Sequence, residues 1–520
     1  MTGRRRTSTT TPRIPRTART SRTRFRRPLR TVLLSAGALA VCGAVAVGCG
    51  AVPGVTGGGG GTVTVMTWAP QDTSATNKPG MPAMAQAYAH WVNAHGGLRG
   101  RTLKVLVCND HNTSAGAAAC ARRAADAHVA AVVGSYSQHS DAFLGPLESA
   151  GIPYLGGYGL TQEEFESPLS YPVNGGDPAL LAGLGEELGR SCGRVALVRP
   201  DTIAGDELAV PFNAGLNASG HAAATDVRAA EGATAYDDQA EQALRTVTGG
   251  TRGAGGTGGT GGTTGTSGTT GTSGTTGTSG TTGTSGTTGT SGTTGTSGTT
   301  GTSGTTGTSG TTGTSGTTGT SGTTTSTSKK GCVVPVLGAR TGTFVDSFRR
   351  IRADYPAVRT ASVLGSVDQS VVDAAGGASG AYEGAYATSW YPVASDARWN
   401  TMKKVVKEHA FGDNRIDPAD AGVQTTWLAY TAFREAVRSL GDGEVTARAV
   451  RHALDGGLKI TTGGLTPTLS WRFEDLAAVI DHPRLVNADV TYQVVREGRL
   501  VSARKGFVDV TKTLETPTSL

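Results

Sequence analysis

One six-residue repeat limits what this chain of 520 residues can fold into. The repeat TTGTSG fills residues 263 to 322, ten copies in sixty residues, and contains only Gly, Thr and Ser. Such a tract has no apolar side chains to bury, so it cannot offset the conformational entropy that ordering would remove. We therefore predict a disordered low-complexity insertion over residues 249–328, and the fold must come from the sequence on either side.

The first 48 residues have the composition of an export signal. Residues 1–30 contain 11 Arg and no acidic residue, and residues 31–48 contain no charge. A basic segment, an apolar segment and then small residues are typical of a secretory signal peptide, which we place at 1–48. Sec export and twin-arginine export, through Arg26-Arg27, both stay open. A membrane-spanning helix is the second alternative, because the apolar stretch is short and rich in Gly and Ala.

The stretch Ala46-Val47-Gly48-Cys49 resembles a bacterial lipobox, in which the Cys becomes the lipid-bearing first residue. We expect lipidation of Cys49 and a flexible Gly-rich tether over residues 49–61. The exported protein is then anchored to the outer face of the cytoplasmic membrane as a lipoprotein.

The positive charge of the chain belongs to its leader. The sequence has 47 Lys and Arg against 40 Asp and Glu, a net charge of +7, and removing the 11 leader Arg leaves 36 against 40, a net of −4. A protein without surplus positive charge is poorly suited to neutralise phosphates. We therefore expect no nucleic-acid partner.

Four cysteines remain once Cys42 leaves with the leader and Cys49 is lipidated: Cys108, Cys120, Cys192 and Cys332. An even number in an exported protein favours two disulfides over four free thiols. Cys192 and Cys332 each precede a predicted strand, as at one end of neighbouring parallel strands, so a bridge between them is expected. No Cys-x-x-Cys or paired His spacing supports zinc, and no metal is expected.

Strands and helices alternate on both sides of the insertion. Strands are predicted over 62–68, 103–108, 129–134, 194–198 and 332–338, and helices over 80–97, 114–128, 207–220 and 237–247, with a further helix starting at an Asp177 cap and Pro178. This order predicts an α/β protein with parallel sheets and right-handed crossovers. The insertion then lies in a surface loop of the second lobe. A linker between independent domains is disfavoured, because the second sheet is only half built at Gly249.

Motifs between residues 90 and 156 occur in a characteristic order. They are Asn93 with Gly96-Gly97 and Gly100-Arg101, Asp110, Val132-Val133-Gly134 with Ser135 and Ser137, and Gly151-Ile152-Pro153. In this order they resemble the substrate-binding proteins of branched-chain amino-acid ABC transporters, the leucine/isoleucine/valine-binding family. The likeness continues through residues 378–391, 461–475 and 491–501.

The resemblance implies a type I periplasmic-binding-protein fold, in which two doubly wound parallel-sheet lobes are joined by three crossover segments. Lobe 1 would comprise residues 62–172 and 388–460, and lobe 2 residues 173–387 and 461–515. The crossovers fall near residues 171–174, 384–389 and 462–464. A small ligand would bind in the cleft between the lobes.

Ligands of open parallel sheets bind beyond the carboxyl ends of the strands, where helix N-termini present free N–H groups. Ser135, Tyr136 and Ser137 follow one predicted strand, Tyr158 and Gly159 follow the next, and Trp68 ends the first. We expect these residues to bind the ligand, with the serines and nearby N–H groups receiving a carboxylate. The alternative is that a Ser at such a turn only caps the helix.

In lobe 2 the family's ligand-facing positions fall near Ala204, Ala339-Arg340 and Val367-Asp368. Arg340 and Asp368 are the candidates, Asp368 as the acid that holds an amino group. The alternative for both is a solvated loop charge, and Ala204 stands where the family often has an aromatic residue.

These features predict a solute-binding lipoprotein that delivers an amino acid or related amide to the permease of an ABC importer. A sensor or regulatory lipoprotein on the same fold is the alternative, because fold alone does not fix function. A cell-surface hydrolase is disfavoured, since no Gly-x-Ser-x-Gly elbow, His-Glu-x-x-His pair or phosphate loop occurs. We expect a monomer that is not an enzyme, with no catalytic residues and no cofactor.

Overall fold

The computed structural model describes residues 61–515 except residues 75, 250–328 and 352–357. All of these residues belong to one unit of the chain, which begins at Gly58. The predicted signal peptide, Cys49, and nearly all of the predicted tether and insertion lie outside the described residues. Within the described part, no helix is long and apolar enough to cross a bilayer.

The first sheet has five parallel strands in the order β2-β1-β3-β4-β5. Its strands are β1 (Thr62–Trp68), β2 (Thr102–Cys108), β3 (Val132–Val133), β4 (Tyr154–Leu155) and β5 (Ser170–Tyr171). The helices that alternate with them are α1 (Gly80–Ala94), α2 (Ser114–Asp126), α3 (Ser140–Ala150) and α4 (Glu163–Glu166). The predicted order is confirmed, although the strand expected over 129–134 is only two residues long.

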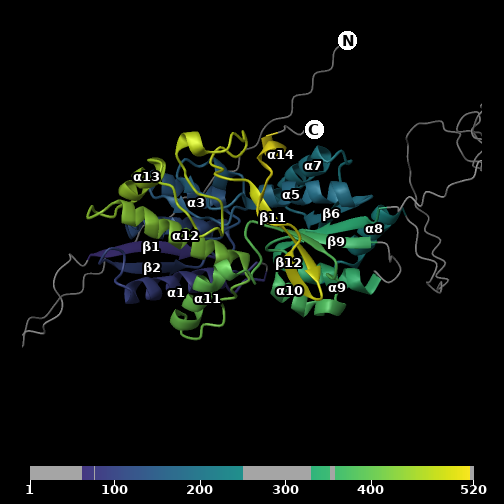
Figure 1. Ribbon diagram of the computed structural model, residues 1–520, viewed down its shortest axis with the longest axis horizontal. Helices are drawn as coiled ribbons and strands as arrows, with labels where there is room; N and C mark the ends of the chain where they lie inside the picture. Colours follow the sequence, from purple (N-terminus) through teal and green to yellow (C-terminus); the bar gives the residue numbers. More distant parts are fainter. Residues whose placement is uncertain (1–60, 75, 250–328, 352–357, 516–520) are drawn as a thin grey trace, which may run out of the picture. The chain divides into compact units, whose positions relative to one another are not determined.

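Three helices from later in the chain complete this lobe: α11 (Asn400–His409), α12 (Ala421–Ser439) and α13 (Ala447–Asp455). Helix α12 packs against both α1 and α13, and α1 also packs against α11 (Figure 1). The carboxylate of Asp420 caps α12 by accepting the Val423 N–H at 2.9 Å. Most side chains of α12 are buried, which is expected of a helix covered on several sides.

The second sheet has the order β12-β11-β10-β9-β8-β6-β7, and β13 pairs with β11. Its strands are β6 (Val195–Pro200), β7 (Thr225–Ala229), β8 (Gly331–Pro335), β9 (Val358–Val363), β10 (Tyr386–Ser389), β11 (Asp489–Arg496), β12 (Arg499–Ser502) and β13 (Val508–Asp509). The five strands from β7 to β10 are parallel, as predicted. The hairpin of β11 and β12 adds antiparallel strands at the β10 edge, which the sequence did not predict.

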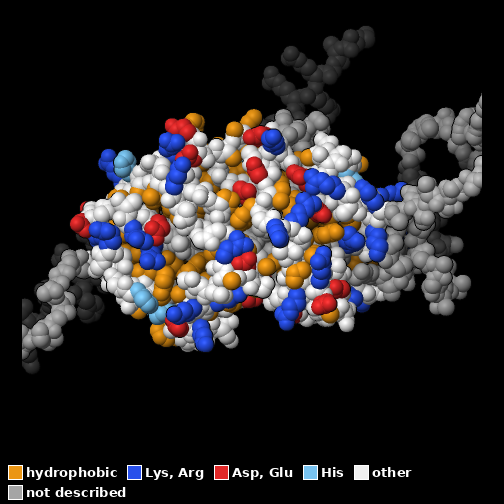
Figure 2. All heavy atoms as spheres, in the orientation of Figure 1, with side chains coloured by type: hydrophobic (Ala, Val, Ile, Leu, Met, Phe, Trp, Pro, Cys, Tyr) orange, Lys and Arg blue, Asp and Glu red, His pale blue; other side chains and the backbone are white. Residues whose placement is uncertain are grey.

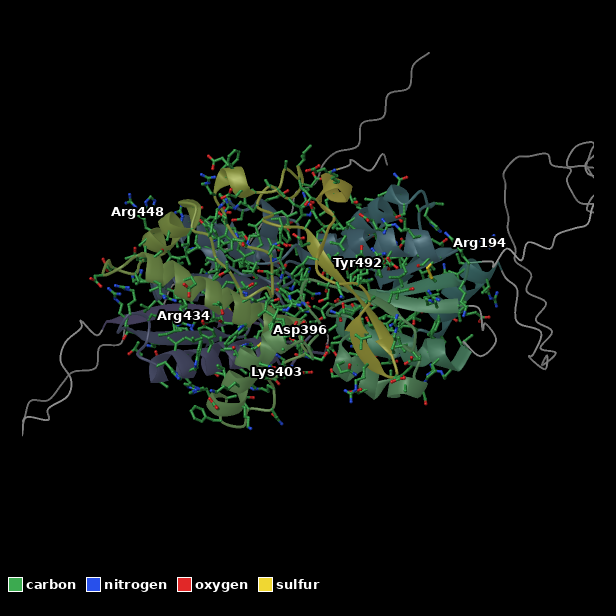
Figure 3. All side chains as sticks on the ribbon, viewed as in Figure 1. Arg194, Asp396, Lys403, Arg434, Arg448 and Tyr492 are labelled. Carbon is green, nitrogen blue, oxygen red and sulfur yellow. A yellow bond between two sulfur atoms is a disulfide. The ribbon has the colours of Figure 1, made fainter. Side chains whose placement is uncertain are left out.

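Helices of the second lobe flank this sheet. They are α5 (Gly176–Ser191), α6 (Ile203–Glu207), α7 (Ala209–Ala218), α8 (Asp237–Thr248), α9 (Thr341–Ile351), α10 (Gln369–Ala374) and α14 (Thr511–Glu515). Helix α5 packs against β9, β10 and β11, and the hydroxyl of Tyr492, on β11, donates to the Gly183 carbonyl at 3.1 Å (Figure 3). The helix expected over 207–220 is α7, and the short helix α6, which the sequence did not predict, precedes it.

Hydrogen bonds join chain segments that lead from one sheet to the other. The indole of Trp390 donates to the Gly176 carbonyl at 2.8 Å, and Asn174 donates to the Tyr391 hydroxyl at 3.0 Å. The indole of Trp471 donates to the Pro172 carbonyl at 2.9 Å, and after this residue the chain returns to the second sheet at β11. These bonds tie three segments, distant in sequence, into one buried polar network. The predicted lobe boundaries themselves stay predictions.

Acidic and basic side chains are mixed over the face shown in Figure 2. Typical surface pairs are Arg415–Asp413 at 2.6 Å and Arg398–Asp396 at 2.9 Å. Exposed pairs of this kind contribute about 0–1 kcal/mol each, so they do not dominate stability. The buried apolar clusters around the two sheets carry most of it.

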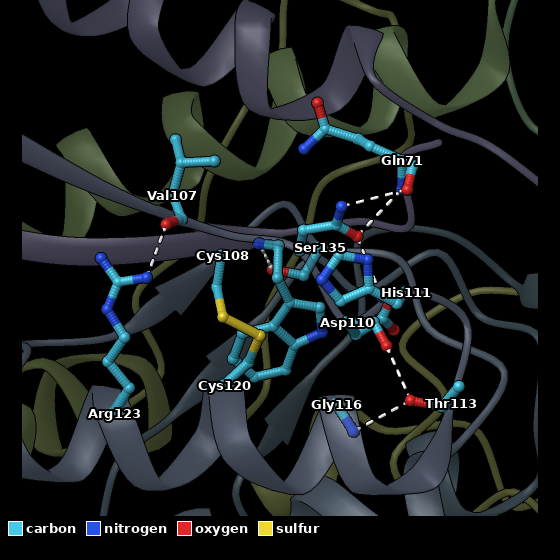
Figure 4. Close-up of a disulfide and its surroundings, with 12 residues drawn as sticks. Gln71, Val107, Cys108, Asp110, His111, Thr113, Gly116, Cys120, Arg123 and Ser135 are labelled. Atoms are coloured by element: carbon cyan, nitrogen blue, oxygen red, sulfur yellow. Dashed lines mark hydrogen bonds between the residues drawn. A yellow bond between two sulfur atoms is a disulfide. The ribbon is translucent and has the colours of Figure 1, made fainter. Parts of the chain in front are cut away.

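Both expected disulfides are formed. Cys108, at the end of β2, is bonded to Cys120 of α2, a helix that Thr113 caps by accepting the Gly116 N–H (Figure 4). Cys192 is bonded to Cys332, and this pairing was predicted from the two strand starts. In the chain-entropy model these loops, with sequence separations of 12 and 140, contribute about 3 and 5 kcal/mol.

The two ends of the insertion lie side by side. Helix α8 ends at Thr248, and Gly249 closes it in the left-handed conformation with φ of 69°. A Cβ built on Gly331, the first residue of β8, would stand only 2.7 Å from the Val247 Cβ. The Gly193 N–H also donates to the Lys330 carbonyl at 2.9 Å. The chain therefore leaves and re-enters the second lobe at one place.

We predict that replacing residues 251–327 by a short Gly-Ser loop preserves the fold. Because the insertion joins adjacent elements, a shorter loop lowers the entropic cost of bringing its two ends together. The free energy of unfolding should therefore stay equal or rise by up to about 2.5 kcal/mol. Denaturant unfolding of the exported domain and of the shortened variant measures this difference. A variant that unfolds at clearly lower denaturant concentration would show that the tract contributes to the folded core.

Candidate functional site

A cavity of about 110 Å³ lies at the carboxyl ends of strands from both sheets. From the first lobe come the loops after β1, β3 and β4; from the second come the start of α5 and the loops after β6, β7, β8 and β9. The lining residues are Thr76, Lys78, Tyr136, Gln138, Tyr158, Leu160, Thr161, Asp177, Pro200, Thr202, Ala204, Gly205, Leu208, Glu231, Val336, Leu337, Gly338, Ala339, Val363, Leu364, Gly365 and Ser366. This is the position in which open parallel sheets bind ligands.

Two of the predicted ligand residues, Tyr136 and Tyr158, line the cavity. Their rings meet edge to face with centroids 4.9 Å apart, and Tyr158 also packs edge to face on Trp390 at 5.2 Å. A Cβ on Gly365 would lie 2.3 Å from the Tyr158 hydroxyl, so a side chain at this position of lobe 2 would displace the ring. Burial raises the pKa of both phenols well above their usual value, so both stay neutral.

Four other predicted residues lie outside the lining of the cavity. Trp68 is fully buried, with its ring against Phe143 and Tyr154, and its backbone N–H donates to the Ser135 hydroxyl at 3.1 Å. Ser137 is buried and accepts the His139 N–H at 3.3 Å. Gly159 has φ of 85°. These residues hold the loops that carry the lining tyrosines.

The lobe 2 candidates also lie outside this cavity. Arg340 donates to the Ser74 carbonyl at 2.6 Å, while its neighbour Ala339 lines the cavity, as does Ala204. Asp368 caps α10 by accepting the Val371 N–H at 2.9 Å, and it lines a second cavity.

Lys78, which was not among the predicted ligand residues, brings a positive charge to the first cavity. Its ammonium pairs with the Asp420 carboxylate at 2.9 Å and lies 5.5 Å from the centre of the Tyr158 ring. Burial alone would lower the pKa of the Lys78 amine, but the Asp420 carboxylate outweighs burial and raises it. Burial alone would raise the pKa of Asp420, but the Lys78 ammonium outweighs burial and lowers it. Only one of the three Lys78 N–H groups has a partner among the described residues.

Asp177 provides the opposite charge. It is the second residue of α5, not the cap as predicted, because Gly175 occupies the cap position. Burial, reinforced by the nearby Glu164 carboxylate, raises the pKa of Asp177 to about 7, although Lys78 partly opposes this. Its carboxyl group has no hydrogen-bond or ion-pair partner in the described part of the chain.

Glu164 lies behind Asp177 and is almost fully buried. Its carboxylate accepts the Leu160 N–H at 3.0 Å and the Gly159 N–H at 3.3 Å, which holds the loop that follows Tyr158. Burial raises the pKa of Glu164 to about 7 in spite of these bonds. Two neighbouring carboxyl groups therefore titrate near neutral pH.

No short motif marks Lys78 or Asp177 in the sequence. The available signal is positional: Lys78 stands in the connection between β1 and α1, and Asp177 stands in the first turn of α5. Such a charge becomes informative only when the tertiary partners, Asp420 and Glu164, are known.

Residues 71–321 match the model of a protein family described as periplasmic binding protein. This confirms the resemblance seen in the sequence. No curated protein sequence is significantly similar to the chain.

Similar solved structures are solute-binding proteins of ABC transporters. A branched-chain amino acid ABC transporter protein from Thermus thermophilus with bound valine is 14% identical, with a TM-score of 0.59, over 87% of this chain and 98% of that chain. A solute-binding protein from Rhodopseudomonas palustris BisB5, in complex with 3,4-dihydroxy benzoic acid, is 11% identical, with a TM-score of 0.56, over 86% and 97%. A fatty acid ABC transporter substrate-binding protein from Thermomonospora curvata is also 11% identical, with a TM-score of 0.56, over 88% and 95%. These similarities establish the fold, and the bound molecules differ.

We predict that the ligand-free protein loses stability as pH rises from 6.5 to 8.5. Asp177 and Glu164 have folded-state pKa values of about 7, above their usual 3.8 and 4.5, so the folded state holds protons that the unfolded state has lost. The free energy of unfolding should fall by roughly 1 kcal/mol over this window. Denaturant unfolding at several pH values measures the slope, which Asp177→Asn should reduce. A stability that increases over the same window contradicts the assignment.

Proposed function

We propose that this chain, which has the periplasmic-binding-protein fold, is the solute-binding lipoprotein of an ABC importer and binds an amino acid or related amide. One observation carries the choice of ligand. The cavity lined by both lobes contains an ammonium with unused N–H groups, Lys78, and a carboxyl group with no partner, Asp177. A ligand with both a carboxylate and an ammonium group complements this pair.

The chemistry of each contact follows from the residues present. The free N–H groups of Lys78 can donate to a ligand carboxylate without breaking the ion pair to Asp420, since the amine has three donors. A ligand ammonium beside Asp177 would favour the ionised carboxylate, so binding lowers the pKa of Asp177. The Tyr136 and Tyr158 rings exclude water from the site, and Glu231 adds an acidic side chain from lobe 2.

Binding to both lobes supplies the driving force for a conformational change. A ligand that contacts lobe 1 through Lys78 and lobe 2 through residues such as Thr202 and Ser366 stabilises the arrangement in which both rims reach it. In this proposal the permease recognises the ligand-bound arrangement. We assign the chain no catalytic step.

Titration calorimetry with free amino acids tests the site. Asp177→Asn should weaken binding of the amino acid about 10- to 150-fold, because a hydrogen bond to a charged group contributes about 1.5–3 kcal/mol. The paired variant Lys78→Met/Asp420→Asn should also weaken binding, without leaving a buried charge unpaired. Asp442→Asn, whose side chain is fully exposed, is the matched control. If the affinities of all variants equal that of the unaltered protein, the ligand binds elsewhere.

The anchor is tested separately. Cys49→Ala should release the protein from the membrane fraction or leave an uncleaved precursor, because the thiol that carries the lipid is lost. Cell fractionation and the mass of the mature chain report the result. A mutant that fractionates and matures like the unaltered protein would exclude the lipoprotein assignment.

A further inference from the structure

A second cavity, of about 130 Å³, lies beside the hairpin of β11 and β12 and the start of α12. Its lining residues are Leu364, Asp368, Gln369, Ser389, Pro392, Ala394, Ser395, Ala419, Gln424, Gln493, Arg499, Leu500 and Val501. The Lys403 ammonium, which Figure 3 labels, donates to the Ala394 carbonyl at 2.5 Å and so fixes the backbone at this lining residue. The predicted ligand residue Asp368 belongs to this second cavity.

Two buried glutamines present unused acceptors here. Gln424 and Gln493 are only 2% and 4% exposed. Their side-chain N–H groups donate to the Pro418 carbonyl at 3.0 Å and to the Tyr391 carbonyl at 3.3 Å, which fixes the orientation of each amide. Neither amide oxygen has a hydrogen-bond partner within the described residues. Both oxygens are open to the cavity, so each can accept a hydrogen bond from an N–H or O–H group that a ligand supplies.

Asp368 adds a negative charge to these acceptors. Its Oδ1 accepts the Val371 N–H at 2.9 Å and the Ser370 hydroxyl at 2.7 Å. Its Oδ2 has no partner in the part of the chain that the structure describes. Arg499 is the basic residue of the lining, but it is exposed, whereas both glutamines are buried. The interior of the cavity therefore favours a donor, and a cationic donor above a neutral one.

The two cavities are neighbours. Leu364 lines both, and the same loop continues to Gly365 and Ser366 in the first and to Asp368 in the second. The ion pair of Lys78 and Asp420 also connects them, since Lys78 lines the first and Ala419, next to Asp420, lines the second. The Asp368 carboxylate contributes to the raised pKa of both Lys78 and Tyr158, which line the first cavity.

We propose that the second cavity receives the far end of the ligand held in the first, and selects an amino acid whose side chain ends in an N–H donor, in the simplest case an ammonium group. This inference rests on the proposed function, because it extends the amino-acid site at Lys78 and Asp177. It names Asp368, Gln424 and Gln493 as the residues that determine specificity. Short apolar amino acids fill the first cavity and leave these three acceptors without a donor.

L-Lysine and L-norleucine test the proposal, because they share the α-amino and carboxyl groups and the four-carbon side chain and differ only in the terminal ammonium. Titration calorimetry with the full exported domain should show L-lysine binding at least tenfold more tightly. Asp368→Asn keeps the helix cap and removes the charge. It should reduce the preference to threefold or less while leaving L-norleucine affinity unchanged. Asp177→Asn should weaken both ligands to a similar extent.

Two further variants and two further amino acids serve as controls. Ala394→Phe, which fills the second cavity, should weaken L-lysine but leave L-alanine unchanged, and Asp442→Asn should change neither. Equal binding of L-lysine and L-norleucine to the unaltered protein would overturn the inference and leave the proposed function standing. L-Glutamate bound as tightly as L-lysine would overturn it in favour of Arg499. Failure of all four amino acids to bind would overturn the proposed function and this inference together.

Discussion

The largely buried ion pair between Lys78 and Asp420, whose side chains are 14% and 22% exposed, organises the candidate site. A buried pair contributes little net stability, because desolvation offsets most of the Coulomb attraction, so its value here is positional. Asp420 is also the cap of α12, and this fixes the carboxylate at the end of a long buried helix. The Lys78 side chain is thereby kept as an ammonium beside the Tyr158 ring, and its N–H groups that do not bind Asp420 can bind a ligand. In the proposed site, the position of this one cation determines where a ligand carboxylate binds.

The second organising feature is the polar network that joins the lobes. Tyr391 accepts from Asn174, which precedes α5, and shares a hydrogen bond with Thr425 of α12 at 2.9 Å. It therefore connects the helix that carries Asp177 with the helix capped by Asp420. Burial raises the pKa of the Tyr391 phenol well above its usual value, so the bridge is neutral at physiological pH. The charged groups of the site are thus positioned by a neutral, fully buried scaffold.

Much of the fold could be predicted from the sequence, and the site only in part. Strand and helix order follow from apolar periodicity, which is local, and the Cys192–Cys332 bond followed from two strand starts. Tyr136 and Tyr158 were found because loops after parallel strands converge. Trp68 was misplaced because successive strand residues point to opposite faces, and its ring packs toward Phe143 instead of the cleft. Lys78, Asp177 and the two glutamines depend on partners hundreds of residues away or on neighbouring loops, which no local pattern reveals.

The Cys192–Cys332 bond has a consequence for the integrity of the chain. It joins a residue before the repeat tract to one after it, and the Gly331 backbone packs on Val247 at the same place. A protease that cut the Gly, Ser and Thr repeat would therefore produce two polypeptides that remain one covalent molecule, with both lobes in register. Only reduction would separate them. A cut within the repeat would thus leave the two parts of the second sheet covalently joined.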